Sequence, residues 1–247
     1  MSSLDLRLGL GSQAFNRAMS LKSLVAESNP LVVLEANDLS SMWQENTQST
    51  PVTADGQTVG YWADQSGNGN DLLQATAGNR PLYKVVNGYP CVEGDGVNDF
   101  LGPVLFSMPQ PWWRISVIEQ LTWTANERIF GGGNANAGLL YQATATPQIF
   151  LFDGAQAAGN TNAVLNTRVV VSEFHSGASS TLQVNNGTAS TGNPGTTAPG
   201  GFTSFSQHTG ALPSNVRIYA VAMGSGAPPY NTSDIKNYLA KTYGVSL

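Results

Sequence analysis

The chain has 247 residues, of which 41% are hydrophobic and 11% are Asp, Glu, Lys or Arg, and its formal net charge is −5. This hydrophobic content excludes a disordered chain, and no apolar run approaches the roughly 20 residues that a membrane-spanning helix needs. The negative net charge argues against a nucleic-acid partner, and charged residues are well below the roughly 25% usual in soluble domains.

Residues 1–29 differ from the rest of the chain. Apolar residues at 15, 18, 19, 21, 24 and 25 predict a short amphipathic helix between 14 and 26, which the Asn29–Pro30 pair closes. We interpret this segment as an arm that either packs on the domain or docks onto a partner. It lacks a basic region followed by a long apolar stretch, so no secretory signal peptide is predicted.

From residue 31 the pattern is that of β-strands separated by turns. Segments such as 114–121 alternate apolar and polar residues over part of their length, which predicts one wet face and one core face. Many short strands without intervening helices predict a sandwich or barrel. The candidate strands are 31–36, 58–62, 81–86, 91–94, 100–101, 114–121, 128–130, 138–141, 148–152, 167–174, 181–184 and 216–223.

The last part of the chain begins with a stretch, 185–215, that is rich in Gly, Thr, Ser, Asn and Pro. It lies between strong strands, so we expect long loops with one short strand near 201–205. Residues 231–243 then predict a helix with one apolar stripe, and Gly244 is its expected C-cap. No internal repeat is found. The expected organisation is an N-terminal arm over 1–29 and one β-sandwich domain over 30–247.

The single cysteine, Cys91, excludes an intrachain disulfide and a zinc knuckle. Its neighbours are Pro90 and Val92, a context that favours a small buried hydrophobic residue.

Three stretches, 31–39, 59–71 and 92–101, together with the ending 235–244, carry a family resemblance. The series resembles the laminin-G-like, concanavalin A-like lectin/glucanase jelly rolls of bacterial and phage proteins. The resemblance covers residues 31–247 and implies an all-β, concanavalin A-like jelly-roll β-sandwich with an N-terminal arm and a short C-terminal helix. The stretch 62–70 is specific for the fold and says little about the ligand.

The same stretches contain many Asp and Asn residues. They favour architectural turns, because Asp64 and Ser66 accept backbone N–H groups while Gly67 and Gly69 supply positive φ angles. The alternative is a calcium site, since hard oxygen ligands suit that ion, although the spacing matches no EF-hand loop. Its candidate ligands are Asp64, Asn68, Asn70, Asp71, Asp95 and Asp99.

Trp112 and Trp113 are the candidate glycan-binding residues, together with Tyr61. Adjacent residues at a strand entrance point to opposite faces, so one indole can join the core while the other stacks on a sugar ring. The alternative is that both cover the end of the sandwich. Trp43 and Trp123 carry the same ambiguity.

Motifs for catalysis are missing. The Glu-x-Asp-x-Glu triplet of the glucanases that the chain resembles does not occur, and Glu119 and Glu173 stand alone on their strands. A glycosidase usually needs two carboxylates about 5–10 Å apart. His175 and His208 are isolated and are predicted to lie at the surface. No phosphate loop is present, so we predict no catalytic residues and a protein that is not an enzyme.

Two functional hypotheses follow. The first is a non-enzymatic structural protein on the surface of a phage particle, a capsid decoration or a head or tail appendage. It would form a homo-oligomer and bind other virion proteins through residues 1–29. The alternative is a carbohydrate-binding module for host-surface or environmental glycans. Neither hypothesis requires a nucleic acid or a membrane. Neither requires a cofactor other than the calcium ion considered above.

Overall fold

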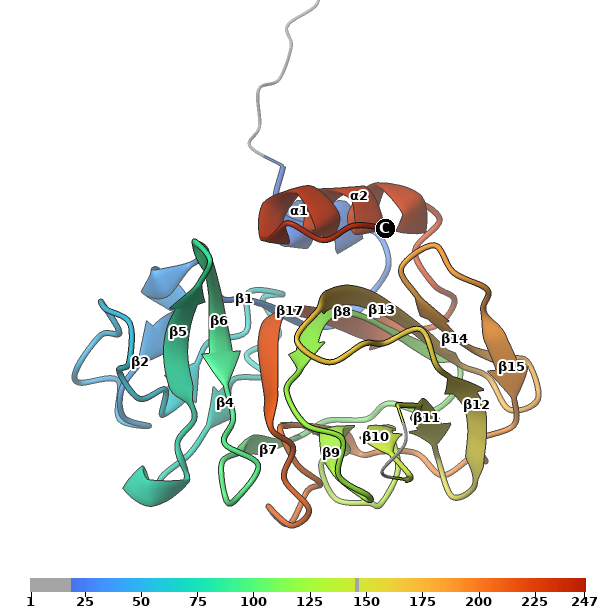
Figure 1. The fold of residues 1–247 in the computed structure, drawn as a ribbon, viewed down its shortest axis with the longest axis horizontal. Helices are drawn as coiled ribbons and strands as arrows, with labels where there is room; N and C mark the ends of the chain where they lie inside the picture. Colours follow the sequence, from blue (N-terminus) through green and yellow to red (C-terminus); the bar gives the residue numbers. More distant parts are fainter. Residues whose placement is uncertain (1–18, 145–146) are drawn as a thin grey trace, which may run out of the picture.

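The computed structural model describes residues 19–144 and 147–247. Two antiparallel sheets pack face to face, and two helices lie on the outer face of the larger sheet (Figure 1). The all-β sandwich with a short C-terminal helix that the sequence predicts is therefore confirmed.

The larger sheet has eight strands, and β17 lies near its centre. β8 pairs with β17 over nearly its whole length, while β1 and β6 share the other edge of β17. The order is β15 (Ser190–Gly192), β14 (Ser180–Val184), β13 (Arg168–His175), β8 (Trp112–Gln120), β17 (Val216–Ser225), β6 (Tyr89–Glu93) and β5 (Leu82–Val86), with β1 (Pro30–Glu35) beside β17.

The smaller sheet has six strands and faces the larger one across the interior (Figure 1). Its order is β12 (Gln156–Asn160), β11 (Ile149–Phe152), β10 (Leu139–Gln142), β9 (Arg128–Gly131), β16 (Gly201–Ser204) and β7 (Leu101–Leu105). A third, three-stranded sheet consists of β2 (Met42–Trp43), β3 (Tyr61–Trp62) and β4 (Leu72–Leu73). Two 3-10 turns, η1 (Leu39–Ser41) and η2 (Ala77–Asn79), precede β2 and β5.

Two hydrophobic cores lie on opposite faces of the larger sheet. The inner core, between the sheets, includes Ile118 and Val171, and the outer core, beneath the helices, includes Val117 and Val170. Successive residues of a strand point to opposite faces, so β8 and β13 supply both cores. The prediction that 114–121 has one solvent-exposed face is therefore wrong. All nine residues of β8 are buried.

The helices that cover the outer face come from the two ends of the described chain. α1 (Leu21–Val25) begins at a capping box formed by Ser20 and Ser23, and α2 (Thr232–Tyr243) ends at Gly244, whose φ is +63°. The predicted C-terminal helix and its glycine cap are confirmed. Part of the predicted helix over 14–26 and of the arm over 1–29 lies outside the described residues.

Candidate functional site

Trp112 and Trp113 point to opposite faces of the larger sheet, and both are fully buried. Trp112 lies in the inner core and stacks on the His175 ring, with centroids 3.6 Å apart and planes 13° apart. Trp113 lies in the outer core, where its indole N–H donates to the carbonyl oxygen of Ser28 at 3.2 Å. Neither ring is open to a sugar in this structure, because Trp112 is enclosed between the two sheets and the helices cover Trp113.

Tyr61, the third aromatic candidate, is half-buried in β3. Its ring meets Trp43 edge-on at 5.5 Å, and its hydroxyl donates to the Asp71 carboxylate. Burial and that carboxylate raise the pKa of Tyr61 to about 12. The tyrosine thus anchors the turn that follows β3.

The first group of proposed calcium ligands lies in that turn. Asp64 Oδ1 accepts the N–H groups of Val33 and Ser66, each at 2.8 Å, and Asp71 Oδ1 accepts the N–H of Asp64 at 2.8 Å. The Asn68 side chain donates to a backbone carbonyl of β1. These side chains hold the turn against β1.

Asp95 and Asp99 lie in a separate turn after β6. Asp95 Oδ1 accepts the N–H of Val97 at 2.8 Å, and Asp99 Oδ2 accepts the N–H of Asp95 at 3.1 Å. Burial and the neighbouring Asp95 carboxylate raise the pKa of Asp99 to about 6. Within residues 19–144 and 147–247, no group of three or more His, Cys, Asp or Glu side chains is placed to hold a metal ion.

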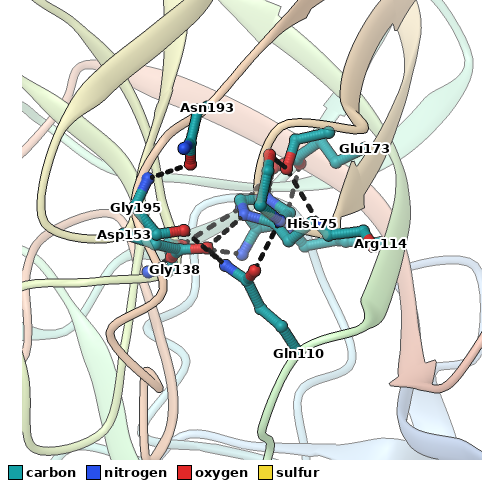
Figure 2. A network of polar contacts seen from close by, with 11 residues as sticks. Gln110, Arg114, Gly138, Asp153, Glu173, His175, Asn193 and Gly195 are labelled. Atoms are coloured by element: carbon teal, nitrogen blue, oxygen red, sulfur yellow. Dashed lines mark hydrogen bonds and ion pairs between the residues drawn. The ribbon is translucent and has the colours of Figure 1, made fainter.

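A polar network crosses the inner core where β8 and β13 lie side by side (Figure 2). Arg114 on β8 forms a two-pronged ion pair with Glu173 on β13, with N–O distances of 2.8 and 2.6 Å. The same guanidinium donates to the carbonyl oxygen of Gly138 at 3.2 and 3.3 Å and lies 4.4 Å from the centre of the Phe130 ring. Arg114 therefore joins the two sheets.

His175 extends this network to the smaller sheet (Figure 2). Its Nδ1 lies 2.7 Å from Asp153 Oδ2, and its Nε2 lies 3.5 Å from Glu173 Oε2. Asp153 also accepts the Gly138 N–H at 2.6 Å and the Gln110 amide at 2.7 Å. The predicted surface position of His175 is wrong, because its side chain is fully buried between these partners.

The network has the residue types of an acid–base site, but nothing can reach it. The side chains of Arg114, Glu173, His175 and Asp153 are at most 1% exposed. Burial alone would raise the pKa of Glu173, but the Arg114 guanidinium and the His175 hydrogen bond outweigh it and hold that pKa below its ordinary value. Paired and hydrogen-bonded buried charges of this kind fasten the sheets together.

An open pocket of about 540 Å³ lies where β1 ends. We call it the Glu35 pocket. Glu35 is the last residue of β1, and Asp38 follows in the turn to η1, where its N–H donates to the Glu35 carbonyl at 3.2 Å. The pocket is lined by Ser20, Lys22, Glu35, Asn37, Asp38, Gln65 and Tyr238.

The two carboxylates of the Glu35 pocket have different surroundings. Glu35 is 4% exposed; its Oε1 accepts the Tyr238 hydroxyl at 2.8 Å, and its Oε2 accepts the Leu21 N–H at 3.3 Å. Asp38 is more exposed; its Oδ2 accepts the Gln65 amide at 2.7 Å, and its Oδ1 caps η1 by accepting the Ser40 N–H at 3.1 Å and the Ser40 hydroxyl at 2.5 Å. Burial raises the pKa of Glu35, and the negative charge of Asp38 adds to the increase, against the hydrogen bonds that lower it.

This arrangement places a buried carboxyl group, whose pKa is raised, and a second carboxylate in one pocket that is open to solvent. Such pairs serve as general acid and general base. The sequence analysis missed the pocket: Glu35 reads as the end of an apolar strand. Tyr238 completes its environment from 203 positions further along the chain.

No family model and no curated protein sequence matches the chain. Among solved structures, a GH54 α-L-arabinofuranosidase soaked with a cyclic sulfate inhibitor matches with a TM-score of 0.66 and 14% identity, over 91% of this chain and 66% of that one. A Trypanosoma rangeli sialidase in complex with sialic acid matches with a TM-score of 0.54 and 14% identity, over 89% and 34%.

A third structure, an arabinofuranosidase complexed with arabinofuranosyl-α-1,2-xylobiose, has a TM-score of 0.52 and 17% identity, over 75% of this chain and 51% of that one. The chain thus spans about a third of the sialidase and just under two thirds of the GH54 enzyme. At such identities the likeness shows the fold, a β-sandwich found in glycosidases.

These structures correct two predictions. The prediction of a non-enzymatic structural protein of a phage virion, and with it the expectation that the chain is not an enzyme, is contradicted, because the structures named above are those of enzymes, a sialidase and two arabinofuranosidases. The missing Glu-x-Asp-x-Glu triplet rules out only one way to present carboxylates on a strand. Within the described residues, no helix is long and apolar enough to cross a membrane.

Proposed function

We propose that this chain is a carbohydrate-active protein of the glycoside hydrolase type, built on a concanavalin A-like jelly roll, with Glu35 and Asp38 as its acid–base pair. The observation that carries the proposal is the pairing of a buried and a more exposed carboxylate in the open Glu35 pocket. The fold's occurrence in arabinofuranosidases and a sialidase supports a glycan as the substrate.

The reaction is hydrolysis of a glycosidic bond. Glu35 gives its proton to the leaving glycosidic oxygen as the bond from the anomeric carbon breaks. Asp38 accepts a proton from the water molecule whose oxygen forms the new bond to that carbon. Solvent then returns the proton from Asp38 to Glu35, so both carboxyl groups are restored.

The other side chains of the pocket hold this pair and the sugar. The Tyr238 hydroxyl orients the Glu35 carboxyl, and the Gln65 amide orients Asp38. Lys22 and Asn37 line the same pocket and offer hydrogen bonds to sugar hydroxyl groups.

The test incubates the protein with a panel of neutral and acidic oligosaccharides and measures hydrolysis as the release of new reducing ends. Glu35→Gln and Asp38→Asn should each lower kcat about 10²- to 10⁴-fold, since each removes one proton-transfer group. Glu27→Gln, an exposed neighbour outside the pocket, is the matched control and should keep full activity. Circular dichroism and thermal unfolding confirm that each variant is folded.

The pH profile separates catalysis from a merely structural role. Activity requires the protonated form of Glu35, so the rate should fall as the pH rises through the raised pKa of that carboxyl. A folded wild-type protein that releases no reducing ends from any glycan of the panel would overturn the proposal, as would a fully active Glu35→Gln variant.

A further inference from the structure

A second open pocket, of about 570 Å³, lies beside the first along α2. We call it the α2 pocket. Tyr238 lines both pockets, so its side chain forms their common wall. The α2 pocket is lined by Met19, Leu24, Asp234, Asn237, Tyr238, Lys241 and Thr242.

The polar side chains of the α2 pocket follow one face of the helix. Asp234, Asn237, Tyr238 and Lys241 are spaced at i, i+3, i+4 and i+7, which places them in one row along the helix surface. Asp234, Asn237 and Lys241 are exposed, and Leu24 of α1 supplies an apolar floor. Polar groups above an apolar floor suit a sugar, which has hydroxyl edges and C–H faces.

The charges along the two pockets are mixed. Lys22 in the Glu35 pocket and Lys241 in the α2 pocket form no ion pair with any described residue. Asp38 and Asp234 place carboxylates in the same pockets. An anionic chain would meet both carboxylates and a cationic chain both lysines, so the lining favours a neutral ligand that donates and accepts hydrogen bonds.

We propose that the two pockets form one groove that binds a neutral oligosaccharide across Tyr238, with sugar units in both the Glu35 pocket and the α2 pocket. Each volume lies within the range of about 300–1,000 Å³ typical of small-molecule sites, so the groove has room for more than one sugar unit. This inference rests on the proposed function and adds the length and charge of the substrate.

The experiment measures kcat/KM and, by calorimetry, binding to the full chain for neutral xylo-oligosaccharides of two to six units and oligogalacturonides of equal length. For the neutral series, affinity should rise about tenfold or more between two and four units, as the α2 pocket fills. Asn237→Ala should remove most of this gain in affinity and leave the affinity for the shortest ligand unchanged. Ser233→Ala, exposed on α2 outside both pockets, is the matched control.

The outcomes separate this inference from the proposed function. Hydrolysis that depends on Glu35 but not on ligand length or Asn237 would overturn the groove and leave the function standing. Length-dependent binding that Asn237→Ala weakens, without hydrolysis, would support the groove and refute the catalytic pair. A preference for oligogalacturonides over the neutral series would also overturn the inference.

Discussion

The ion pair between Arg114 and Glu173 should be a major source of stability, and replacing Arg114 with Met tests this. The substitution removes two hydrogen bonds to Glu173 and two to the Gly138 carbonyl, and it leaves Glu173 fully buried with only His175 Nε2 nearby, at 3.5 Å. Breaking a buried pair on one side costs about 3–5 kcal/mol. In a domain of this size, that loss lowers Tm by roughly 6–20 °C.

A double-mutant cycle isolates the interaction. Glu173→Met alone leaves the buried Arg114 guanidinium with the Gly138 carbonyl as its remaining hydrogen-bond acceptor and the Phe130 ring beside it, and we expect a similar loss of unfolding free energy. The double variant removes both charges, so it should lose about 1–3 kcal/mol less unfolding free energy than the sum of the losses of the two single variants. Urea unfolding followed by tryptophan fluorescence and circular dichroism measures all four proteins, and an unchanged m-value checks the comparison.

The sign of the pH dependence adds a second test. In the wild type the lowered pKa of Glu173 contributes stability that is present above its ordinary pKa of about 4.5 and is lost as the pH falls through the folded-state pKa. Without Arg114, burial favours the protonated carboxyl. The difference in unfolding free energy between the wild type and Arg114→Met should therefore become smaller as the pH falls from 7 toward 4.

The matched control is Arg217→Met. Arg217 pairs with Glu93 at 2.6 Å and Glu119 at 3.1 Å, but its side chain is 20% exposed, so water can replace part of the lost contacts and the expected loss of stability is smaller than that of Arg114→Met. Additive effects in the cycle, or an Arg114→Met variant that loses no more stability than Arg217→Met, would refute the reasoning.

Three further predictions concern single sites. Asp99→Asn should raise the unfolding free energy at pH 7 by about 1–3 kcal/mol. The reason is that the raised pKa of Asp99 makes the wild type lose stability as the pH rises from about 4 to 6. Urea unfolding measures this, and the advantage of the variant should vanish below pH 4. Gly244→Ala should lower stability by about 1–3 kcal/mol in the same assay, because φ is +63° there and a Cβ would collide with Tyr89. The Cys91 thiol, whose pKa burial raises to about 12, should not react with a thiol reagent at pH 8 until the protein is unfolded.

The local parts of the fold are predictable from the sequence. The strand predicted over 216–223 is β17, and the helix predicted over 231–243 is α2, because each has a clear periodicity and a turn signal at its end. The burial of Trp113 was not predictable, since it depends on helices from distant parts of the chain that cover the outer face of β8.

The sites depend even more on distant partners. Arg114 and Glu173 are 59 residues apart, and each stands among apolar or small neighbours that suggest no charge pair. Glu35 and Tyr238 meet across 203 residues. Asp64 and Asp71, in contrast, were recognisable as turn residues, because their hydrogen bonds run mostly to backbone close by in the sequence or to the neighbouring strand.

The most direct test of the proposed glycoside hydrolysis is incubation of the full chain with neutral oligosaccharides in ¹⁸O-labelled water, followed by mass spectrometry of the products. Each bond cleaved by this protein should add one ¹⁸O atom to a product, and Glu35→Gln should reduce the labelled product about 100-fold or more at neutral pH, while Glu27→Gln keeps the wild-type yield. Labelled products at the level of the protein-free blank, from a folded wild-type sample, would contradict the account.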